Sequence, residues 1–324
     1  MSRRLSSWPI DRSVNVRSIV QPLRGILVAD LTRYLPGPFA SRELMRLGAR
    51  VVRLEAPGGD PLREVAPEWD RRLNAGKESV LWDRDRDPKL GPALCAQADV
   101  VLEGFRPGVA ARLGVGPDDV PGSVVYCSLT GFGADDRRVG HDLNYMGWAG
   151  ALEPTAPAMP PLPVADLAAG ALTAVSRVLA ALLQRARAGE GARIVVSMTH
   201  EAHELAHFAG PLTGRLACYR IYECADGRHV TVAALEPKFW QRLCELLDRP
   251  DLVSRASDAH GELETIFRTR TLGEWLELFH GEDVCVGPVS TLAEASRDFG
   301  VQEPEARPPA LGEHTAAWRK QLRL

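Results

Sequence analysis

The strongest constraint on the fold is a regular alternation of short apolar runs with amphipathic stretches between residues 25 and 133. The apolar runs read GILVADL, RVVRLEAP, SVLWD, ADVVLEGF and SVVYCSLTGFG, and helical spacing of apolar residues occurs in PFASRELMRLGA and KLGPALCAQA. Strands buried on both faces are continuously apolar, and helices that connect successive strands make those strands parallel. The pattern therefore predicts an α/β domain built on a parallel sheet.

The following part of the chain predicts a long helix that begins near Asp166. The segment ADLAAGALTAVSRVLAALLQRARAGEG offers an acidic N-cap at Asp166, about five turns of mostly Ala, Leu and Val, and a charged end that contains glycine. Because it is apolar nearly all round, we expect this helix to be buried. A strand, ARIVVSM, and a helix that contains HELAH follow.

The pattern changes after Gly210. CYRIYECADGRHVTVAAL predicts a β-hairpin whose turn holds Asp226 and Gly227, and PKFWQRLCELL and TLGEWLELF predict helices. The expected parts of the chain are a polar extension at 1–22, a large domain at 23–210 completed by the Pro-rich tail 300–324, and a smaller α+β domain at 211–299.

The charge balance excludes a general nucleic-acid binder. The chain has 39 Lys and Arg against 42 Asp and Glu, a net charge of −3 at pH 7, whereas such proteins carry a basic excess. No stretch approaches the roughly 18 continuous apolar residues of a membrane span. The six cysteines lack C-x-x-C spacing and indicate neither a zinc knuckle nor a disulfide framework. We expect a cytoplasmic protein that binds neither nucleic acid nor membrane.

The segment HELAHFAGPLT, from His203 to Thr213, is similar to a zinc-protease motif in which two histidines four residues apart bind the metal. One class of these proteases requires a third histidine, where Thr213 stands, and a later methionine, yet none follows Met198. Another class requires a glutamate on a following helix, but Glu223 lies too early and in a predicted strand. A solvated helix face is the preferred interpretation, and we expect no metal.

Three basic residues follow predicted strands or lie in turns of the α/β part: Arg53, Lys77 and Arg106. Taken singly, each is typical of a surface charge. The carboxyl ends of parallel strands converge on a ligand crevice, and cations placed there bind phosphates. Together the three residues indicate an exposed site for an anionic cofactor.

The chain resembles the family III CoA-transferases (CaiB/BaiF-like), and among them most the α-methylacyl-CoA racemases. The resemblance runs from about Leu23 to Thr315, through LRGILVADLTRYLPGPFASRELMRLGARVVRLEAPGGD, LNAGKESVLWD, ADVVLEGFRPGVAARLGVGPDD, GHDLNY, ADLAAG and LGEHT. It implies a Rossmann-like large domain, a small domain, an interlocked homodimer and acyl-CoA substrates. It implies no metal and no permanently bound cofactor, because coenzyme A arrives as part of the substrate.

The resemblance also implies the site residues. The catalytic aspartate of the family falls on Asp166, which forms a mixed anhydride in the transferases and acts as a general acid/base in the racemases. The second catalytic base of the racemases falls on His141, and the glutamate that supports it from the small domain falls on Glu236. Without the resemblance, Asp166 is typical of a helix N-cap and His141 of a capping or core histidine. The CoA contacts of the family fall on Arg53, Asn74, Lys77, Gly104, Phe105, Arg106 and Arg112.

A histidine and a carboxylate suit the racemisation of a 2-methylacyl thioester. One group removes the α-proton from one face of a planar enolate, and the other returns a proton to the opposite face. A carboxylate needs a pKa raised by burial to exchange protons near pH 7. We also expect free backbone N–H groups in the first turn of the Asp166 helix to hold the enolate oxygen.

Two alternatives stay open at this point: CoA transfer through an anhydride on Asp166, and a non-catalytic acyl-CoA binder. The segments GFGADDRRVGHD, PPLPVAD and TGRLACY depart from the racemase pattern beside the expected acyl pocket. The acyl group of the substrate therefore stays open as well.

Overall fold

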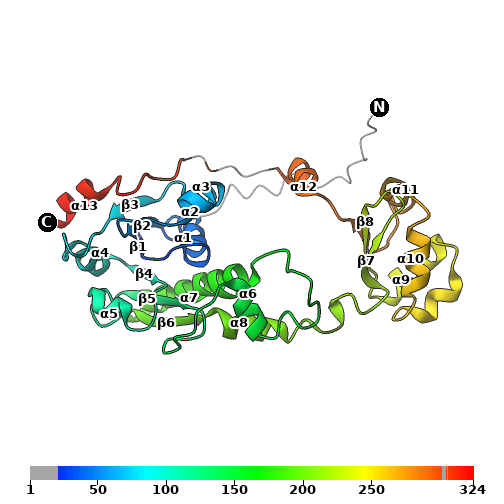
Figure 1. Ribbon diagram of the computed structural model, residues 1–324, viewed down its shortest axis with the longest axis horizontal. Helices are drawn as coiled ribbons and strands as arrows, with labels where there is room; N and C mark the ends of the chain where they lie inside the picture. The colour runs from blue at the N-terminus through cyan, green and yellow to red at the C-terminus, as the bar shows by residue number, and fades with distance from the viewer. Residues whose placement is uncertain (1–20, 301–303, 305) are drawn as a thin grey trace. The chain divides into compact units, whose positions relative to one another are not determined.

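The computed structural model describes residues 21–300, 304 and 306–324. Within that part, the contacts divide the chain into a large unit, at 21–207, 304 and 306–324, and a small unit, at 208–300. The polar extension expected at 1–22 lies, except for its last two residues, outside the described residues. Figure 1 labels the helices and strands of both units.

The large unit is built on a six-stranded parallel sheet, which confirms the predicted α/β class. In spatial order its strands are β3 (Glu78–Leu81), β2 (Arg50–Glu55), β1 (Leu27–Asp30), β4 (Val100–Glu103), β5 (Val125–Thr130) and β6 (Ala192–Ser197). The strand order reverses at β1, whose neighbours are β2 and β4. Open α/β sheets bind ligands at such a reversal, in the crevice outside the carboxyl ends of the strands.

Helices cover both faces of this sheet (Figure 1). One face is covered by α1 (Pro36–Arg46) and α7 (Thr173–Ala188), and the other by α4 (Leu90–Gln97) and α13 (Thr315–Leu322). Successive strand residues point to opposite faces: Val28 packs into the first core and Ala29 into the second. This two-sided burial is the reason for the continuous apolar runs. The other α-helices of the large unit are α2 (Leu62–Val65), α3 (Pro67–Asn74), α5 (Val109–Leu113), α6 (Asp142–Trp148) and α8 (Met198–Ala206).

The C-terminal segment packs against the edge strand β3. The backbone N–H of Leu81 donates to Oγ1 of Thr315 at 2.9 Å. In α13, Trp318 is 1% exposed, and its indole N–H donates to Oε2 of Glu78 at 2.6 Å. These contacts attach the end of the chain to the large unit.

The predicted long helix consists of two elements. It begins as a π-helix, η2 (Ala165–Leu172), and continues as α7. The N-cap is Val164, so the expectation of an N-cap at Asp166 is wrong. η2 packs against α1, α6 and α8. Gly170 permits the close approach of α8, because a Cβ at this position would lie 2.8 Å from Cγ of Met198.

Within the described residues, the segment Ala165–Ala188 is long and apolar enough to cross a membrane by length and composition alone. This differs from the expectation that no stretch approaches such a span. Ala174 and Val178 of this segment are completely buried in the core beside the sheet. We therefore interpret the segment as a core helix of the large unit.

The small unit contains a three-stranded antiparallel sheet packed against helices. Its strands, in spatial order, are β7 (Tyr219–Glu223), β8 (His229–Ala233) and β9 (Val286–Pro288). Its helices are η3 (Gly210–Leu212), α9 (Pro237–Leu246), η4 (Pro250–Arg255), α10 (His260–Phe267), α11 (Leu272–Leu278) and α12 (Leu292–Phe299). The predicted hairpin forms between β7 and β8, with Gly227 at a φ of 72° in its loop. In the core, the ring of Phe267 lies 5.2 Å from those of Tyr222 and Trp275.

Candidate functional site

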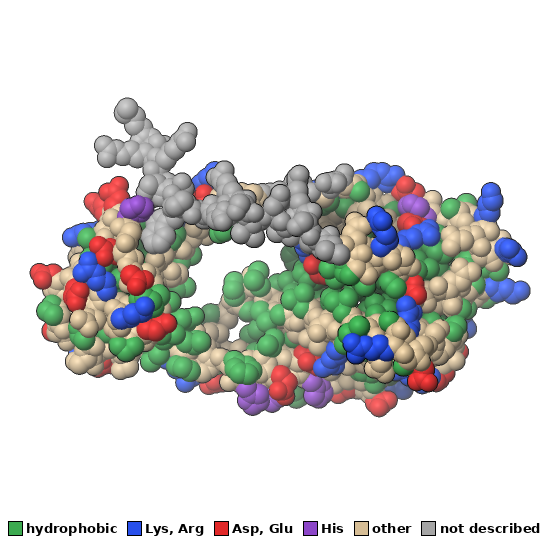
Figure 2. All heavy atoms as spheres, turned by 180° about the vertical axis from the view of Figure 1, so that it is seen from behind, with side chains coloured by type: hydrophobic (Ala, Val, Ile, Leu, Met, Phe, Trp, Pro, Cys, Tyr) green, Lys and Arg blue, Asp and Glu red, His purple; other side chains and the backbone are tan. Residues whose placement is uncertain are grey.

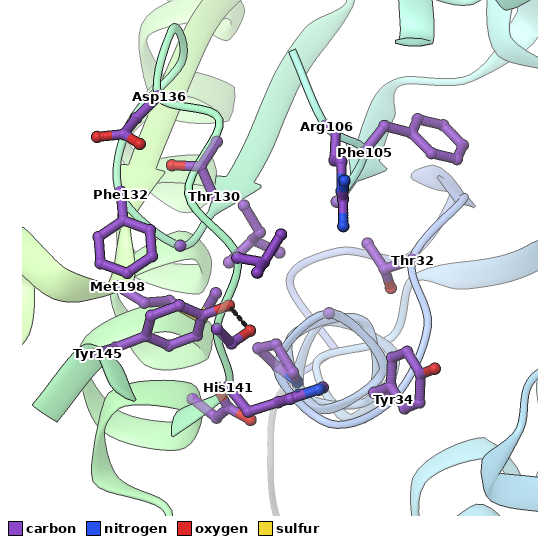
Figure 3. A pocket seen from close by; sticks show the side chains of 18 of the residues that line it. Thr32, Tyr34, Phe105, Arg106, Thr130, Phe132, Asp136, His141, Tyr145 and Met198 are labelled. Carbon is purple, nitrogen blue, oxygen red and sulfur yellow. Dashed lines mark hydrogen bonds between the residues drawn. The ribbon is translucent and has the colours of Figure 1, made fainter. Parts of the chain in front are cut away.

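A pocket of about 840 Å³ opens at the carboxyl ends of β1, β4, β5 and β6. Its walls come from the loops after the first three of these strands, the segment before α6, and the first residues of η2 and α8. Figure 3 shows these segments facing one another around a hollow. The pocket therefore lies in the crevice expected where the strand order reverses. The charged or titratable groups in its wall include Arg33, Arg106, Asp136, Arg138, His141 and Asp166.

Asp166 lines this pocket from the start of η2 and is partly buried. Its backbone N–H donates to Oδ1 of Asp142, in the first turn of α6, at 2.8 Å. Burial, followed by the negative charge of Asp142, raises the pKa of Asp166 to about 7. Both protonation states of Asp166 are therefore populated near neutral pH, as an acid/base group requires.

His141 lines the same pocket from the N-cap position of α6. Its backbone N–H donates to Oδ1 of Asn144 at 3.1 Å, which ties the backbone to the first turn of the helix. The side chain is exposed, and its ring lies edge-on to that of Tyr34 with 6.0 Å between the centroids. The structure thus brings His141 and Asp166 into one pocket from two different elements.

The first turn of η2 does not present the free N–H groups that the sequence suggested. The N–H of Asp166 donates to Asp142, and the N–H of Leu167 donates to the carbonyl oxygen of Pro163 at 3.0 Å. These two groups are therefore not free to hold an enolate oxygen. The physical reason is that the carboxylate of Asp142 reaches this turn from α6 and takes one of its donors.

Four of the predicted CoA contacts lie after β4. Gly104, Phe105 and Arg106 line the pocket, and the N–H of Phe105 donates to Oε2 of Glu103 at 2.7 Å. The side chain of Arg106 is exposed and turned into the hollow (Figure 3). Arg112 is exposed on α5 but is not part of the pocket wall.

The other three predicted CoA contacts are buried. Arg53, Asn74 and Lys77 are 1%, 0% and 3% exposed. Nη2 of Arg53 lies 2.9 Å from Oδ2 of Asp60. Nζ of Lys77 donates to Oδ1 of Asn74 at 2.9 Å and to Oγ of Ser41 at 2.7 Å, and burial lowers the pKa of Lys77 to about 7. The expected exposure of the cations Arg53 and Lys77 is wrong, because oxygen atoms inside the large unit surround both side chains. Their contact with coenzyme A stays a prediction.

Glu236 belongs to the small unit, where it is the exposed N-cap residue of α9. Its side chain makes no capping hydrogen bond, so the carboxylate is accessible. Its support of His141 stays a prediction.

The histidines of HELAH lie at the end of α8. His203 and His207 are exposed with 4.7 Å between ring centroids, and His207 is the C-cap. Nδ1 of His203 lies 2.9 Å from the carbonyl oxygen of Ala149, so this nitrogen carries the proton. In the part of the chain that the structure describes, no three His, Cys, Asp or Glu side chains are grouped to hold a metal.

Two residues of this region were not predicted from the sequence. Asp142 follows His141 directly in GHDLNY. Its position in the first turn of a helix was the sequence signal that could have identified it as a residue of the site. Tyr34 lines the pocket in a left-handed backbone conformation, at a φ of 63°. No local sequence pattern predicts this conformation, because a residue with a large side chain adopts it mainly where tertiary contacts impose it.

Comparison with known proteins gives consistent matches over most of the chain. The profile of CoA-transferase family III matches residues 23–307. The chain is 31% identical to the human alpha-methylacyl-CoA racemase, over 84% of this chain and 78% of that protein. It is 29% identical to the human succinyl-CoA:glutarate CoA-transferase, over 84% and 73%. The crystal structure of Rv3272 from Mycobacterium tuberculosis superimposes with a TM-score of 0.80 and 29% identity, covering 92% of this chain and 99% of that one.

Proposed function

Because the chain belongs to the family III CoA-transferases, which are enzymes, we propose that it moves a proton at the α-carbon of a 2-methylacyl-CoA thioester. One observation carries the proposal: His141 and Asp166 lie in one pocket, and the pKa of Asp166 is raised to about 7. Racemisation needs two groups that exchange protons near neutral pH. Attack by Asp166 as a nucleophile needs the ionised carboxylate, and the raised pKa reduces the population of that form.

In the proposed reaction, one of the two groups takes the α-proton as a base. The C–H bond breaks, and its electron pair moves into the enolate of the thioester. The other group, protonated beforehand, donates its proton to the opposite face of the α-carbon. In one direction neutral His141 takes the α-proton and becomes a cation, while protonated Asp166 gives up its proton and becomes a carboxylate. With the other enantiomer, the Asp166 carboxylate takes the α-proton and the His141 cation donates one. The step is balanced without an oxidant or a permanently bound cofactor.

For the coenzyme A part of the substrate, we propose contacts with the loop after β4. Arg106 is exposed there, and Arg33 lines the same pocket from the loop after β1. Phosphate groups bind to such cations through charge-assisted hydrogen bonds. Arg112 on α5 extends this basic surface in the proposal.

CoA transfer is the second candidate, favoured by the similarity to the human succinyl-CoA:glutarate CoA-transferase. In this reaction the ionised carboxylate of Asp166 attacks the thioester carbon, CoA leaves as the thiolate, and a mixed anhydride forms. The thiolate then attacks the aspartyl carbonyl of the anhydride, which releases the first carboxylic acid and leaves CoA as a thioester on Asp166. A second carboxylate attacks this thioester and displaces the thiolate, which attacks the acyl carbonyl of the new anhydride, so that the second acid leaves as its CoA thioester and the Asp166 carboxylate is regenerated. A non-catalytic acyl-CoA binder is the third candidate, and the presence of both acid/base groups in the pocket argues against it.

Incubation of one enantiomer of 2-methylacyl-CoA with the protein in deuterated water tests the proposal. Incorporation of deuterium at the α-carbon supports proton transfer. Transfer of CoA to an added carboxylic acid without any α-exchange contradicts it and supports the second candidate. Binding without either reaction supports the third.

We also propose that the protein acts as a homodimer. Exposed apolar side chains on the large unit include those of Leu172 (49%), Leu183 (56%) and Leu205 (47%), and Figure 2 shows hydrophobic side chains at the surface of the molecule. These side chains are available for contact with a second copy of the chain. Light scattering should give twice the chain mass of 35.3 kDa. The mass of one chain at micromolar concentration would contradict the dimer.

A cytoplasmic location stays our proposal. All six cysteines are unpaired, and five of them are buried, which fits a reducing compartment. Microscopy of the tagged full-length chain tests the location.

A further inference from the structure

Tyr34 has an unusual backbone conformation. Within the described residues it is one of three non-glycine residues with positive φ, at 63°. This conformation is unfavourable for a residue with a large side chain and is found mostly where the surrounding structure imposes it. The side chain is 41% exposed, so burial of the ring in the core does not impose it. The backbone of Tyr34, in contrast, makes a contact with a buried side chain.

Asp60 provides this contact. The backbone N–H of Tyr34 donates to both carboxylate oxygens of Asp60, at 3.2 and 3.3 Å. Asp60 is 2% exposed and is itself fixed by the N–H of Leu62, at 3.0 Å, and by Nη2 of Arg53, at 2.9 Å. The buried pair of Arg53 and Asp60 therefore holds the turn between β1 and α1 in the conformation that Tyr34 requires.

The ring of Tyr34 lies in the pocket near His141. The two rings are 6.0 Å apart between centroids, with 83° between their planes. Figure 3 shows the His141 side chain extended toward Tyr34. The acyl group of a substrate whose α-carbon lies at His141 is therefore within reach of the Tyr34 ring.

We propose that Tyr34 determines specificity for the acyl part of the substrate, and that Arg53 positions Tyr34 through Asp60. This inference rests on the proposed function, in which His141 acts at the α-carbon. The aromatic ring offers an apolar surface to a branched acyl chain. Arg53 thereby contributes to substrate binding from the interior, through its contact with Asp60.

Two substitutions separate the ring from the backbone. Tyr34→Phe keeps the ring, and Tyr34→Gly removes it while accepting the left-handed conformation without strain. Calorimetry measures the affinity of each variant for coenzyme A and for an unreactive S-(2-methylalkyl) thioether of coenzyme A. Thermal denaturation provides the check on folding.

We expect Tyr34→Phe to bind both ligands as the wild type does. Tyr34→Gly should bind coenzyme A normally but the thioether roughly tenfold more weakly, as the loss of one aromatic contact predicts. Its melting temperature should not fall, because the strain is relieved. Wild-type affinity of Tyr34→Gly for the thioether, or an equal loss in Tyr34→Phe, would overturn the inference. Failure of the wild type to bind coenzyme A at all would overturn the proposed function and this inference with it.

A double-mutant cycle tests the positioning by Arg53. Arg53→Lys keeps the buried positive charge but changes the contact with Asp60. It should weaken binding of the thioether in the wild-type background and have no further effect in Tyr34→Gly, since the two residues act through one contact. Two results would contradict the positioning role. One is that Arg53→Lys weakens thioether binding equally in the wild-type and Tyr34→Gly backgrounds. The other is that Arg53→Lys weakens the binding of coenzyme A itself as much as that of the thioether. Asp60→Asn serves in the same cycle if Arg53→Lys does not fold.

Discussion

The carboxylate of Asp142 accepts a hydrogen bond of 2.8 Å from the backbone N–H of Asp166. Asp142 is the first residue of α6 and follows His141, so this bond joins the two elements that present the candidate acid/base groups. Asp142 also adds a negative charge beside Asp166, and burial raises the pKa of Asp142 itself. One side chain thus fixes the start of η2 and adjusts the acidity of Asp166.

Asp142→Asn should lower the pKa of Asp166 from about 7 toward the ordinary value of 3.8. The substitution keeps an oxygen that accepts the N–H, but it removes the charge that disfavours ionisation. The protonated form of Asp166 is then lost at lower pH than in the wild type. Titration of the side-chain carboxyl carbons by NMR, with Asp166→Asn to assign the signal, measures the change.

Asp136→Asn is the control for this titration. Asp136 lines the same pocket but pairs with Arg138 at 2.7 Å, and the pKa of Asp166 should stay unchanged in this variant. An unchanged pKa in Asp142→Asn would show that burial alone sets the acidity of Asp166. The pH dependence of proton exchange should shift in the same direction as the titration.

Single substitutions should separate the two faces of the substrate. In His141→Ala, Asp166 should still exchange the α-proton of one enantiomer with solvent, while racemisation stops. Asp166→Asn should exchange the α-proton of the opposite enantiomer, because His141 remains. Proton NMR on each enantiomer of 2-methylacyl-CoA provides the measurement. Loss of CoA transfer in Asp166→Asn, together with full transfer in His141→Ala, would identify a transferase.

Asp166→Asn should also stabilise the protein at neutral and higher pH. The folded state raises the pKa of Asp166 from 3.8 to about 7, so the wild type loses stability as the pH rises through this range. Asparagine does not ionise and avoids this loss, which is on the order of a few kcal/mol. Thermal denaturation should show a difference between variant and wild type that grows from pH 4 to pH 8. A constant difference would contradict the raised pKa.

Arg106→Ala should weaken the binding of coenzyme A several-fold, and more strongly at low salt. Exposed contacts between arginine and phosphate are screened over about 8 Å at physiological ionic strength. Arg86→Ala is the matched control, because Arg86 is 88% exposed and lies outside the pocket wall. Calorimetry at two salt concentrations compares them. Equal affinities of both variants and the wild type would place the phosphate groups elsewhere.

His203→Ala and His207→Ala should leave the activity intact. Both side chains are exposed at the end of α8, and the position of the missing third ligand is occupied by Thr213. Elemental analysis of the purified protein should find no stoichiometric zinc. One zinc per chain that disappears in the double variant would contradict this prediction.

The α/β class and the parallel sheet of the large unit follow from the amino-acid sequence alone. These features arise from local patterns, since a strand buried on both faces must be apolar at every position. The hairpin around Gly227 was also predictable from a local pattern, the Asp-Gly turn between two apolar strands. His141 and Asp166 were identified because the short segments that contain them resemble family motifs. In the structure both line one pocket at the carboxyl ends of the strands.

The environment of these residues, in contrast, arises from contacts that form only in the folded chain. Arg53 was predicted as an exposed cation, yet the carboxylate of Asp60 reaches it in the interior and also holds Tyr34 in a strained conformation. The acidity of Asp166 likewise depends on Asp142, which lies 24 positions earlier and meets it only where α6 packs against η2. Burial and charge proximity are properties of the packed molecule. A local pattern can identify an ionisable side chain, but its pKa and its partners depend on residues that folding brings from elsewhere in the chain.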